Sequence, residues 1–166
     1  MSIADSDYTR SVQSIVGWKE TDKTYMVLQI HPESDLLNVV AEGKFSLEEG
    51  KRTFLQMLEA IVLHKTKKVL FDGRKLIGNP ETMERFYYGE FAARAVASSV
   101  ERGASPATQF AYVLKEPLLD PGRFGETVAV NRGMNVKAFE SPDEALPWLG
   151  IEPANKPDTG DGKCRA

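Results

Sequence analysis

The sequence has few of the residues that build disulfides, metal sites or basic surfaces. Its 166 residues include one cysteine, Cys164, and two histidines, His31 and His64. A single cysteine excludes an intrachain disulfide, and neither histidine has a second histidine or cysteine at the spacing of a metal site. The formal net charge of -3 at pH 7 gives no electrostatic reason to expect a nucleic acid partner. We therefore expect no metal, no cofactor and no nucleic acid.

Long apolar runs and catalytic motifs are missing as well. No apolar run approaches the roughly 20 residues that a membrane-spanning helix needs. The N-terminal residues 1–10 are polar and acidic, without the basic and then apolar order of a secretory signal. These features predict a cytoplasmic protein that does not insert into a membrane. The sequence also has no nucleophile elbow and no Walker loop, so we expect no enzyme activity.

The two ends differ in composition from the middle of the chain. From Pro153 onward the sequence is rich in proline, glycine and charge, with little to bury. Apolar residues make up 42% of the whole chain, an ordinary value for a protein with a packed core. We predict one folded domain at residues 11–151, between a flexible N-terminus at 1–10 and a disordered tail at 152–166.

Within the predicted domain, β-type and helical segments alternate. Their order is β-β-α-β-α-β-α-β-α, which predicts a mixed sheet with helices packed on it. The strands are expected at 24–30, 36–42, 68–72, 109–114 and 136–139, and the helices at 47–64, 79–100, 124–131 and from 142 onward.

Two helix starts have typical capping residues. Ser46 and Glu49 are spaced as a capping box. In this motif the side chain of each residue accepts a hydrogen bond from the backbone N–H of the other. Asn79 and Pro80 are typical of the cap and the first position of the second helix. The two glycines of 73–78 indicate a loop before that helix.

Two stretches of the sequence resemble a known family. They are 69–94 (VLFDGRKLIGNPETMERFYYGEFAAR) and, more specifically, 124–149 (FGETVAVNRGMNVKAFESPDEALPWL). The second has a helix ending in Asn-Arg-Gly, a short strand, and a capped helix ending in Trp-Leu. Over about residues 11–150 the chain resembles the SpoIIAA-like (STAS/SEC14-like) branch of the STAS family. The resemblance implies an α/β fold, with a mixed sheet of about five strands and four helices mainly on one face.

The resemblance also implies a regulatory role. The best-known family members are anti-anti-sigma factors, which bind a kinase and are phosphorylated on the serine of an Asp-Ser motif. The matching region here, 78–82, has no Asp-Ser, and Thr82 is its only hydroxyl residue. We therefore do not carry the phosphorylation switch over to this chain. The SEC14-like branch is also linked to an apolar-ligand-binding type of domain, which implies a second kind of ligand.

The second helix is apolar on two sides. At about 100° per residue, one stripe holds Phe86, Gly89, Ala93, Val96, Ala97 and Val100. The opposite side holds Tyr87, Tyr88, Phe91 and Ala95, flanked by Glu84 and Arg94. We expect the first stripe to pack on the sheet and the second to form an outer aromatic face.

The outer aromatic face has two interpretations. Either the N-terminal segment or the third helix covers it, or it is a protein-binding surface or the wall of an apolar pocket. We predict the partner- or ligand-binding residues to be Thr82, Glu84, Tyr87, Tyr88, Phe91 and Arg94. The predicted function is a non-catalytic regulatory module that binds a protein partner or a second copy through this helix. The alternative is a carrier or sensor of an apolar small molecule held between the second and third helices.

Overall fold

The computed structural model describes residues 25–152, which form a five-stranded sheet in the order β1-β2-β3-β4-β5. The strands are β1 (Met26–Pro32), β2 (Leu36–Lys44), β3 (Lys68–Ile77), β4 (Gln109–Val113) and β5 (Val136–Phe139). β1 pairs antiparallel with β2, and all other neighbouring strands are parallel. The sheet is therefore mixed, as a hairpin followed by strand–helix alternation predicts.

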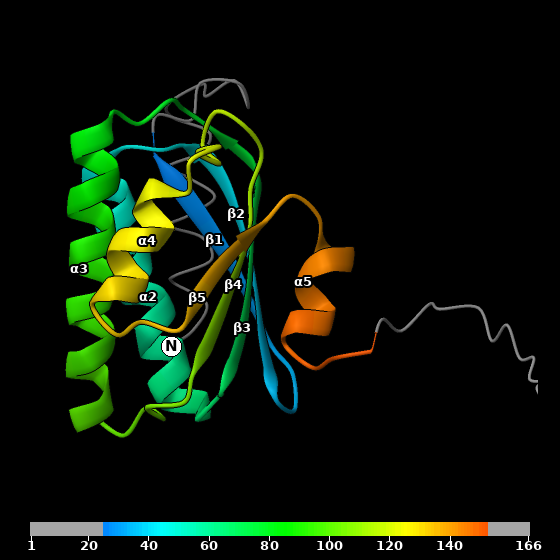
Figure 1. Cartoon of the computed structure of the whole chain (residues 1–166). Coiled ribbons are helices and arrows are strands. Elements are labelled where there is room, and N and C mark those ends of the chain that lie inside the picture. Colours follow the sequence, from blue (N-terminus) through cyan, green and yellow to red (C-terminus); the bar gives the residue numbers. More distant parts are fainter. Residues whose placement is uncertain (1–24, 153–166) are drawn as a thin grey trace, which may run out of the picture.

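The helices lie on both faces of the sheet, but unequally. They are α2 (Leu47–His64), α3 (Thr82–Glu101), α4 (Phe124–Asn131) and α5 (Pro142–Trp148). Figure 1 shows α2, α3 and α4 together on one face, and α5 alone on the other. The predicted element order and the arrangement of helices mainly on one face are confirmed.

Two hydrophobic cores result from the alternation of side chains along the strands. Val69 and Phe110 belong to the larger core, between the sheet and α2–α4. Their neighbours Leu70 and Ala111 point the other way, into the smaller core beneath α5. The central strands are thus apolar on both faces, which explains why they appear in the sequence as continuous apolar runs.

The prediction of a loop at 73–78 is wrong, because β3 continues to Ile77. Its extension pairs with the end of β2, where Lys75 lies opposite Glu42 after a break in register. Gly73 is needed there for close packing rather than for a turn. A Cβ atom on it would lie 2.6 Å from the side chain of Leu114.

The start of the second helix also differs from the prediction. The α3 helix begins at Thr82, not at Pro80, and its N-cap is Glu81 rather than Asn79. The backbone N–H of Glu81 donates to the Glu84 carboxylate at 2.8 Å, which completes a capping box.

Part of the predicted domain organisation falls outside the described residues. This applies to the predicted flexible residues 1–10, to 11–24 of the predicted domain, and to 153–166 of the predicted tail.

Candidate functional site

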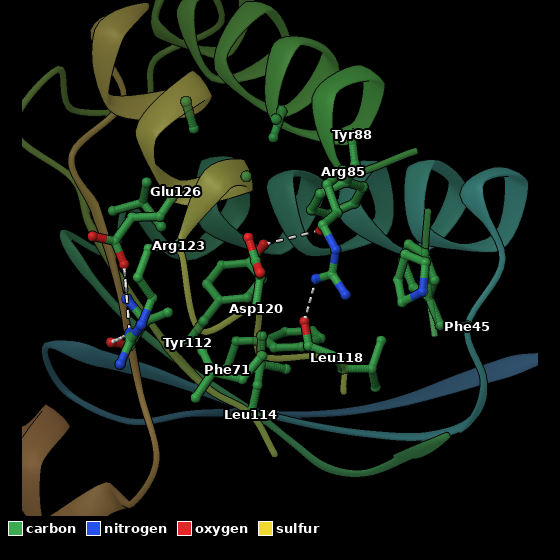
Figure 2. Close-up of a pocket in the computed structure, with 18 of the residues that line it drawn as sticks. Phe45, Phe71, Arg85, Tyr88, Tyr112, Leu114, Leu118, Asp120, Arg123 and Glu126 are labelled. Atoms are coloured by element: carbon green, nitrogen blue, oxygen red, sulfur yellow. Dashed lines mark hydrogen bonds and ion pairs between the residues drawn. The ribbon is translucent and has the colours of Figure 1, made fainter. Parts of the chain in front are cut away.

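An apolar cavity of about 140 Å³ lies between the sheet and the helices α3 and α4 (Figure 2). The sheet contributes Phe71, Leu76, Tyr112, Val136 and Ala138, and the two helices contribute Tyr88, Gly89, Ala92, Gly125 and Ala129. Phe45 and Leu114, which follow β2 and β4, line the cavity toward the carboxyl ends of the parallel strands. Open α/β sheets commonly bind ligands at that end.

Small residues on the two helices shape the cavity. At Gly89 the helices approach so closely that an added Cβ atom would lie 2.8 Å from the Gly125 carbonyl oxygen. Ala92 and Ala129 are both buried and both line the cavity. Because a methyl group reaches less far than the larger apolar side chains, these positions leave space above the sheet.

Two tyrosines place the main polar groups inside the cavity. The hydroxyls of Tyr88 and Tyr112 are 3.1 Å apart and share a hydrogen bond, in which either can be the donor. The Tyr112 ring stacks on Phe71 at 4.6 Å between centroids, and only 8% of Tyr112 is exposed. The Tyr88 ring meets Phe45 edge-on at 5.9 Å. Both phenols are thus held in place by aromatic neighbours.

Burial keeps these phenols protonated. It raises the pKa of Tyr88 to about 12, although the hydrogen bond from Tyr112 acts in the opposite direction. Burial also raises the pKa of Tyr112 well above its ordinary value. At neutral pH both residues are therefore uncharged hydrogen-bond donors.

Four charged side chains, Arg85, Asp120, Arg123 and Glu126, form what we call the polar rim of the cavity (Figure 2). Arg85 on α3 donates to the carbonyl oxygens of Leu118 and Pro117, each at 2.7 Å. This fastens the loop between β4 and α4 to the first turns of α3.

The remaining rim residues bind backbone groups around α4. Asp120 accepts from the backbone N–H of Phe124 at 2.9 Å, and this bond is the main cause of its lowered pKa. Glu126 accepts from the N–H of Ala138 at 2.8 Å, and Arg123 donates to the carbonyl oxygen of the same residue. Two cations and two carboxylates leave the rim without net charge.

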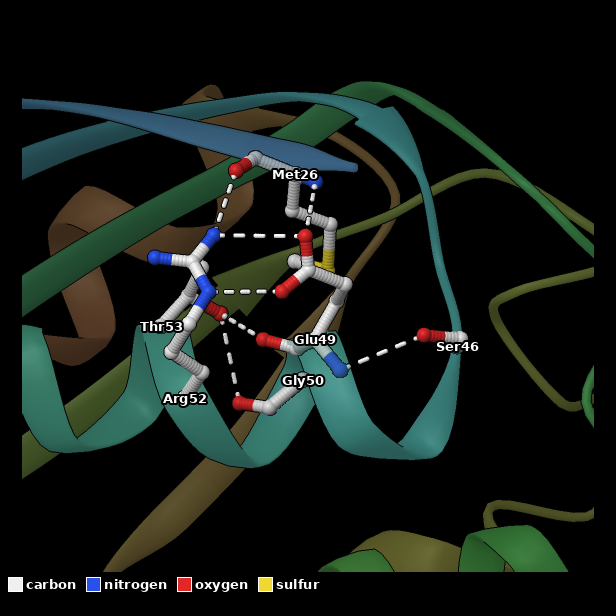
Figure 3. Close-up of polar contacts among 6 residues, drawn as sticks. All are labelled: Met26, Ser46, Glu49, Gly50, Arg52 and Thr53. Carbon is white, nitrogen blue, oxygen red and sulfur yellow. Dashed lines mark hydrogen bonds and ion pairs between the residues drawn. The ribbon is translucent and has the colours of Figure 1, made fainter. Parts of the chain in front are cut away.

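One further polar cluster holds the β1 end of the cavity (Figure 3). The Glu49 carboxylate accepts from the N–H of Met26 at 3.2 Å, and Arg52 donates to the Met26 carbonyl at 2.9 Å. Arg52 also pairs with Glu49 at 2.6 Å. The predicted capping box at Ser46 is thus only half formed. Ser46 accepts from the Glu49 N–H, but the Glu49 carboxylate is used on β1.

The outer aromatic face predicted for α3 is wrong for two of its three aromatic residues. Tyr88 points into the cavity, and Phe91 packs against Phe54 of α2 at 6.4 Å between ring centroids. Among the described residues, α2 covers Phe91, whereas the N-terminal segment named as one possible cover lies outside them. Tyr87 is 47% exposed and is the one predicted aromatic residue on the outer side.

The other predicted site residues lie at the surface or at the helix start. Thr82 and Arg94 are exposed, and Arg94 pairs with Glu90 at 3.4 Å. Glu84 belongs to the capping box. The expected inner stripe is also partly wrong, because Ala97 and Val100 are exposed while Ala92 is buried. The structure therefore brings only Tyr88 of the six predicted residues into the cavity.

The sequence analysis missed the polar rim. Arg85 sits in an aromatic part of α3, and Asp120, Arg123 and Glu126 look like ordinary surface charges in the sequence. One signal was available. Leu118 and Leu119 are two consecutive apolar residues between the predicted strand at 109–114 and the predicted helix at 124–131, and both line the cavity.

Among residues 25–152, no group of three or more histidine, cysteine, aspartate or glutamate side chains is placed to hold a metal ion. Within the same range, every helix is too short or too polar to span a bilayer.

Neither a protein-family model nor a curated protein matches the sequence. Among solved structures, the chain is similar to an anti-sigma factor antagonist from Mycobacterium paratuberculosis. The TM-score is 0.51 at 12% identity, over 78% of this chain and 98% of that chain. The chain has a STAS-like fold. This confirms the fold class that the family resemblance predicted.

A second similar structure is an uncharacterised protein of the DUF3478 family with a SpoIIAA-like fold, from Shewanella loihica. Its TM-score is 0.44 at 19% identity, over 80% of this chain and 99% of that chain.

Proposed function

We propose that this STAS-like chain is a non-catalytic module that carries or senses a small apolar molecule, held between the sheet, α3 and α4. The observation that carries the proposal is the cavity of about 140 Å³, lined mainly by aliphatic and aromatic side chains. Apolar cavities of about 150 Å³ stay dry and bind benzene-sized molecules. This is the alternative function that the sequence analysis named, a ligand between the second and third helices.

The polar groups around the cavity support binding rather than catalysis. Asp120 and Glu126 accept backbone N–H bonds, and Arg85 and Arg123 donate to backbone carbonyls. The phenols of the tyrosine pair keep their protons far above neutral pH. General acid–base catalysis favours a group whose pKa lies near the working pH, and neither phenol supplies one.

The proposal is tested by measuring how a ligand changes the melting temperature of the wild type and of a variant whose cavity is blocked. Saturating isopropylbenzene is expected to raise the melting temperature of the wild-type protein by several degrees, because a ligand that binds only the folded state stabilises it. Ala92→Leu places a larger side chain in the cavity and is expected to abolish that rise. Ala97→Leu, on the exposed side of the same helix, is the control and should keep it. The proposal fails if isopropylbenzene leaves the wild-type melting temperature unchanged.

The second candidate function is protein binding at the outer side of α3. Met83 and Tyr87, one turn apart, are 54% and 47% exposed. The similar solved structure is named an anti-sigma factor antagonist, and its name indicates a protein target for that protein. This candidate uses no phosphorylated serine. Thr82 shares the first turn of α3 with Glu84 and follows Glu81, and both carboxylates would repel a phosphate.

Self-association tests the simplest form of the second candidate, in which the partner is a second copy. Sedimentation equilibrium of the wild type would show a dimer, and Tyr87→Ala with Met83→Ala should weaken it at least tenfold, because exposed aromatic residues are favoured anchors. Leu63→Ala on α2 is the control, since Leu63 is 75% exposed on a different helix. A wild type that stays monomeric at high concentration contradicts the homodimer.

A further inference from the structure

Among the residues that the structure describes, the tyrosine pair has one hydrogen-bond donor more than it uses. A phenol carries one O–H, so Tyr88 and Tyr112 together have two protons, and their mutual hydrogen bond uses one. Among the described residues, neither hydroxyl makes a second hydrogen bond. Tyr112 is more than nine-tenths buried. Both Tyr112 and Tyr88 line the cavity. Buried donors are rarely left without an acceptor, so the second proton points to a ligand group.

The charges around the cavity argue against a carboxylate as that group. Arg85 uses both terminal nitrogens on the carbonyls of Pro117 and Leu118. Arg123 donates to Ala138 and lies 3.8 Å from Glu126. A buried carboxylate needs a paired cation, and each rim cation is already engaged and balanced by a rim carboxylate. A neutral acceptor needs only the phenolic proton.

We infer that the cavity takes an apolar molecule with one neutral hydrogen-bond acceptor, such as a ketone or an ester, which receives the second proton of the Tyr88–Tyr112 pair. The inference rests on the proposed function, since it requires that the cavity binds an apolar molecule. The acceptor therefore fixes the orientation of the ligand, and the apolar walls supply most of the affinity.

Three probes of nearly the same shape separate these ideas. Isopropylbenzene is apolar, acetophenone has a carbonyl at the same place, and benzoate has a charged carboxylate there. Titration calorimetry on the wild-type chain should give acetophenone about fivefold tighter binding than isopropylbenzene, the value of one net hydrogen bond. Benzoate should bind at least tenfold more weakly than acetophenone.

Variants of Tyr88 and Tyr112 test whether these two residues cause the preference for acetophenone over isopropylbenzene. The double variant Tyr88→Phe with Tyr112→Phe removes both protons, so its preference for acetophenone should disappear while its affinity for isopropylbenzene is kept. Tyr87→Phe, at an exposed neighbouring position, is the control and should keep the preference. Retained isopropylbenzene binding also shows that the double variant is folded. If it does not fold, the wild-type series still decides whether the cavity prefers a neutral acceptor.

The two proposals fail in different ways. If the wild type binds none of the three probes, the proposed function is wrong. If it binds isopropylbenzene as tightly as acetophenone, or binds benzoate best, the inference about the acceptor is wrong while the apolar-ligand function stands. A double variant that keeps the acetophenone preference overturns the assignment to the tyrosine pair.

Discussion

Gly89 sets how closely α3 and α4 pack. An added Cβ atom would lie 2.8 Å from the Gly125 carbonyl oxygen and 3.2 Å from the Val128 side chain. Because a backbone oxygen cannot move aside alone, Gly89→Ala should push the helices apart and reshape the roof of the cavity. We expect a net loss of unfolding free energy, since overpacking costs about 1–3 kcal/mol and the gain in helix propensity is about 1 kcal/mol.

Urea unfolding measures this loss, and the facing helix supplies a control. A Cβ atom on Gly125 would lie 3.6 Å from the Arg85 carbonyl oxygen, which is an ordinary contact. Gly125→Ala should therefore keep the unfolding free energy or raise it by up to about 1 kcal/mol, the gain in helix propensity. Equal stabilities for the two alanine variants would contradict the close approach at Gly89.

The tyrosine pair makes stability depend on alkaline pH. An unfolded tyrosine has a pKa of about 10, whereas burial raises the pKa of Tyr88 to about 12 and that of Tyr112 well above its ordinary value. The folded state therefore keeps protons that the unfolded state releases. This contribution is fully present below pH 10 and is lost as the pH rises toward 12.

The measurement is urea unfolding in steps between pH 9 and pH 11.5. The wild type should lose unfolding free energy across this window, and Tyr88→Phe with Tyr112→Phe should lose less. Tyr87→Phe should follow the wild type, because its side chain is 47% exposed. An identical pH dependence in all three proteins would show that the pair does not titrate as buried groups.

At the scale of elements, the sequence predicted best what depends on local pattern. The bounds of α4 (Phe124–Asn131) and β5 (Val136–Phe139) agree with the prediction to the residue. The helix ends before Gly133, whose φ of 93° suits glycine, and the short strand carries the strand-favouring residues Val136 and Phe139. Periodicity and turn residues are sufficient where neighbouring chain segments decide the structure.

Elements that depend on distant neighbours were predicted poorly. The extension of β3 past Gly73 depends on pairing with the end of β2, and glycine followed by charged residues looks like a turn in the sequence. The helical wheel of α3 correctly shows two apolar sides. It does not show that α2 covers Phe91 or that Tyr88 faces Tyr112 across a cavity. The cavity arises from the fit of several elements, so no local pattern could reveal it.

The loop between β4 and α4 lines the cavity with Leu118, Leu119 and Asp120. Arg85 holds it through two bonds of 2.7 Å to the carbonyls of Leu118 and Pro117. Lysine cannot make both bonds with the same geometry, because it lacks the planar fork of arginine. We expect Arg85→Lys to loosen the loop, with at least threefold faster amide exchange over residues 115–123 and faster ligand release.

Hydrogen–deuterium exchange resolves this effect by segment. Arg94→Lys is the matched control, since Arg94 lies on the same helix but is exposed and, among the described residues, pairs with Glu90. Its loop exchange should equal that of the wild type. Unchanged amide exchange of the loop in Arg85→Lys would show that Arg85 does not hold this loop in place.

At the scale of the whole molecule, the two cores differ in how completely side chains fill them. The larger core, under α2–α4, contains the cavity, and the smaller core under α5 packs Ala111 with no exposed surface. Empty volume in a core lowers stability by about 24 cal/mol per Å³. An empty cavity therefore lowers the stability of the larger core, on the side where we propose that the protein binds a ligand.

The same substitution in each core tests this difference. Ala138 on β5 lines the cavity, whereas Ala111 on the adjacent β4 faces the smaller core. Ala138→Val should fill empty space, keep or raise the unfolding free energy by up to about 1 kcal/mol, and reduce the melting-temperature rise with isopropylbenzene. Ala111→Val should overpack its core and lose about 1–3 kcal/mol, with an undiminished ligand response. Valine is favoured in strands, so a loss at Ala111 would not come from strand propensity. Urea unfolding and thermal melts of the two variants measure these changes. Equal losses of unfolding free energy in both variants would mean that the cavity cannot accommodate an added side chain.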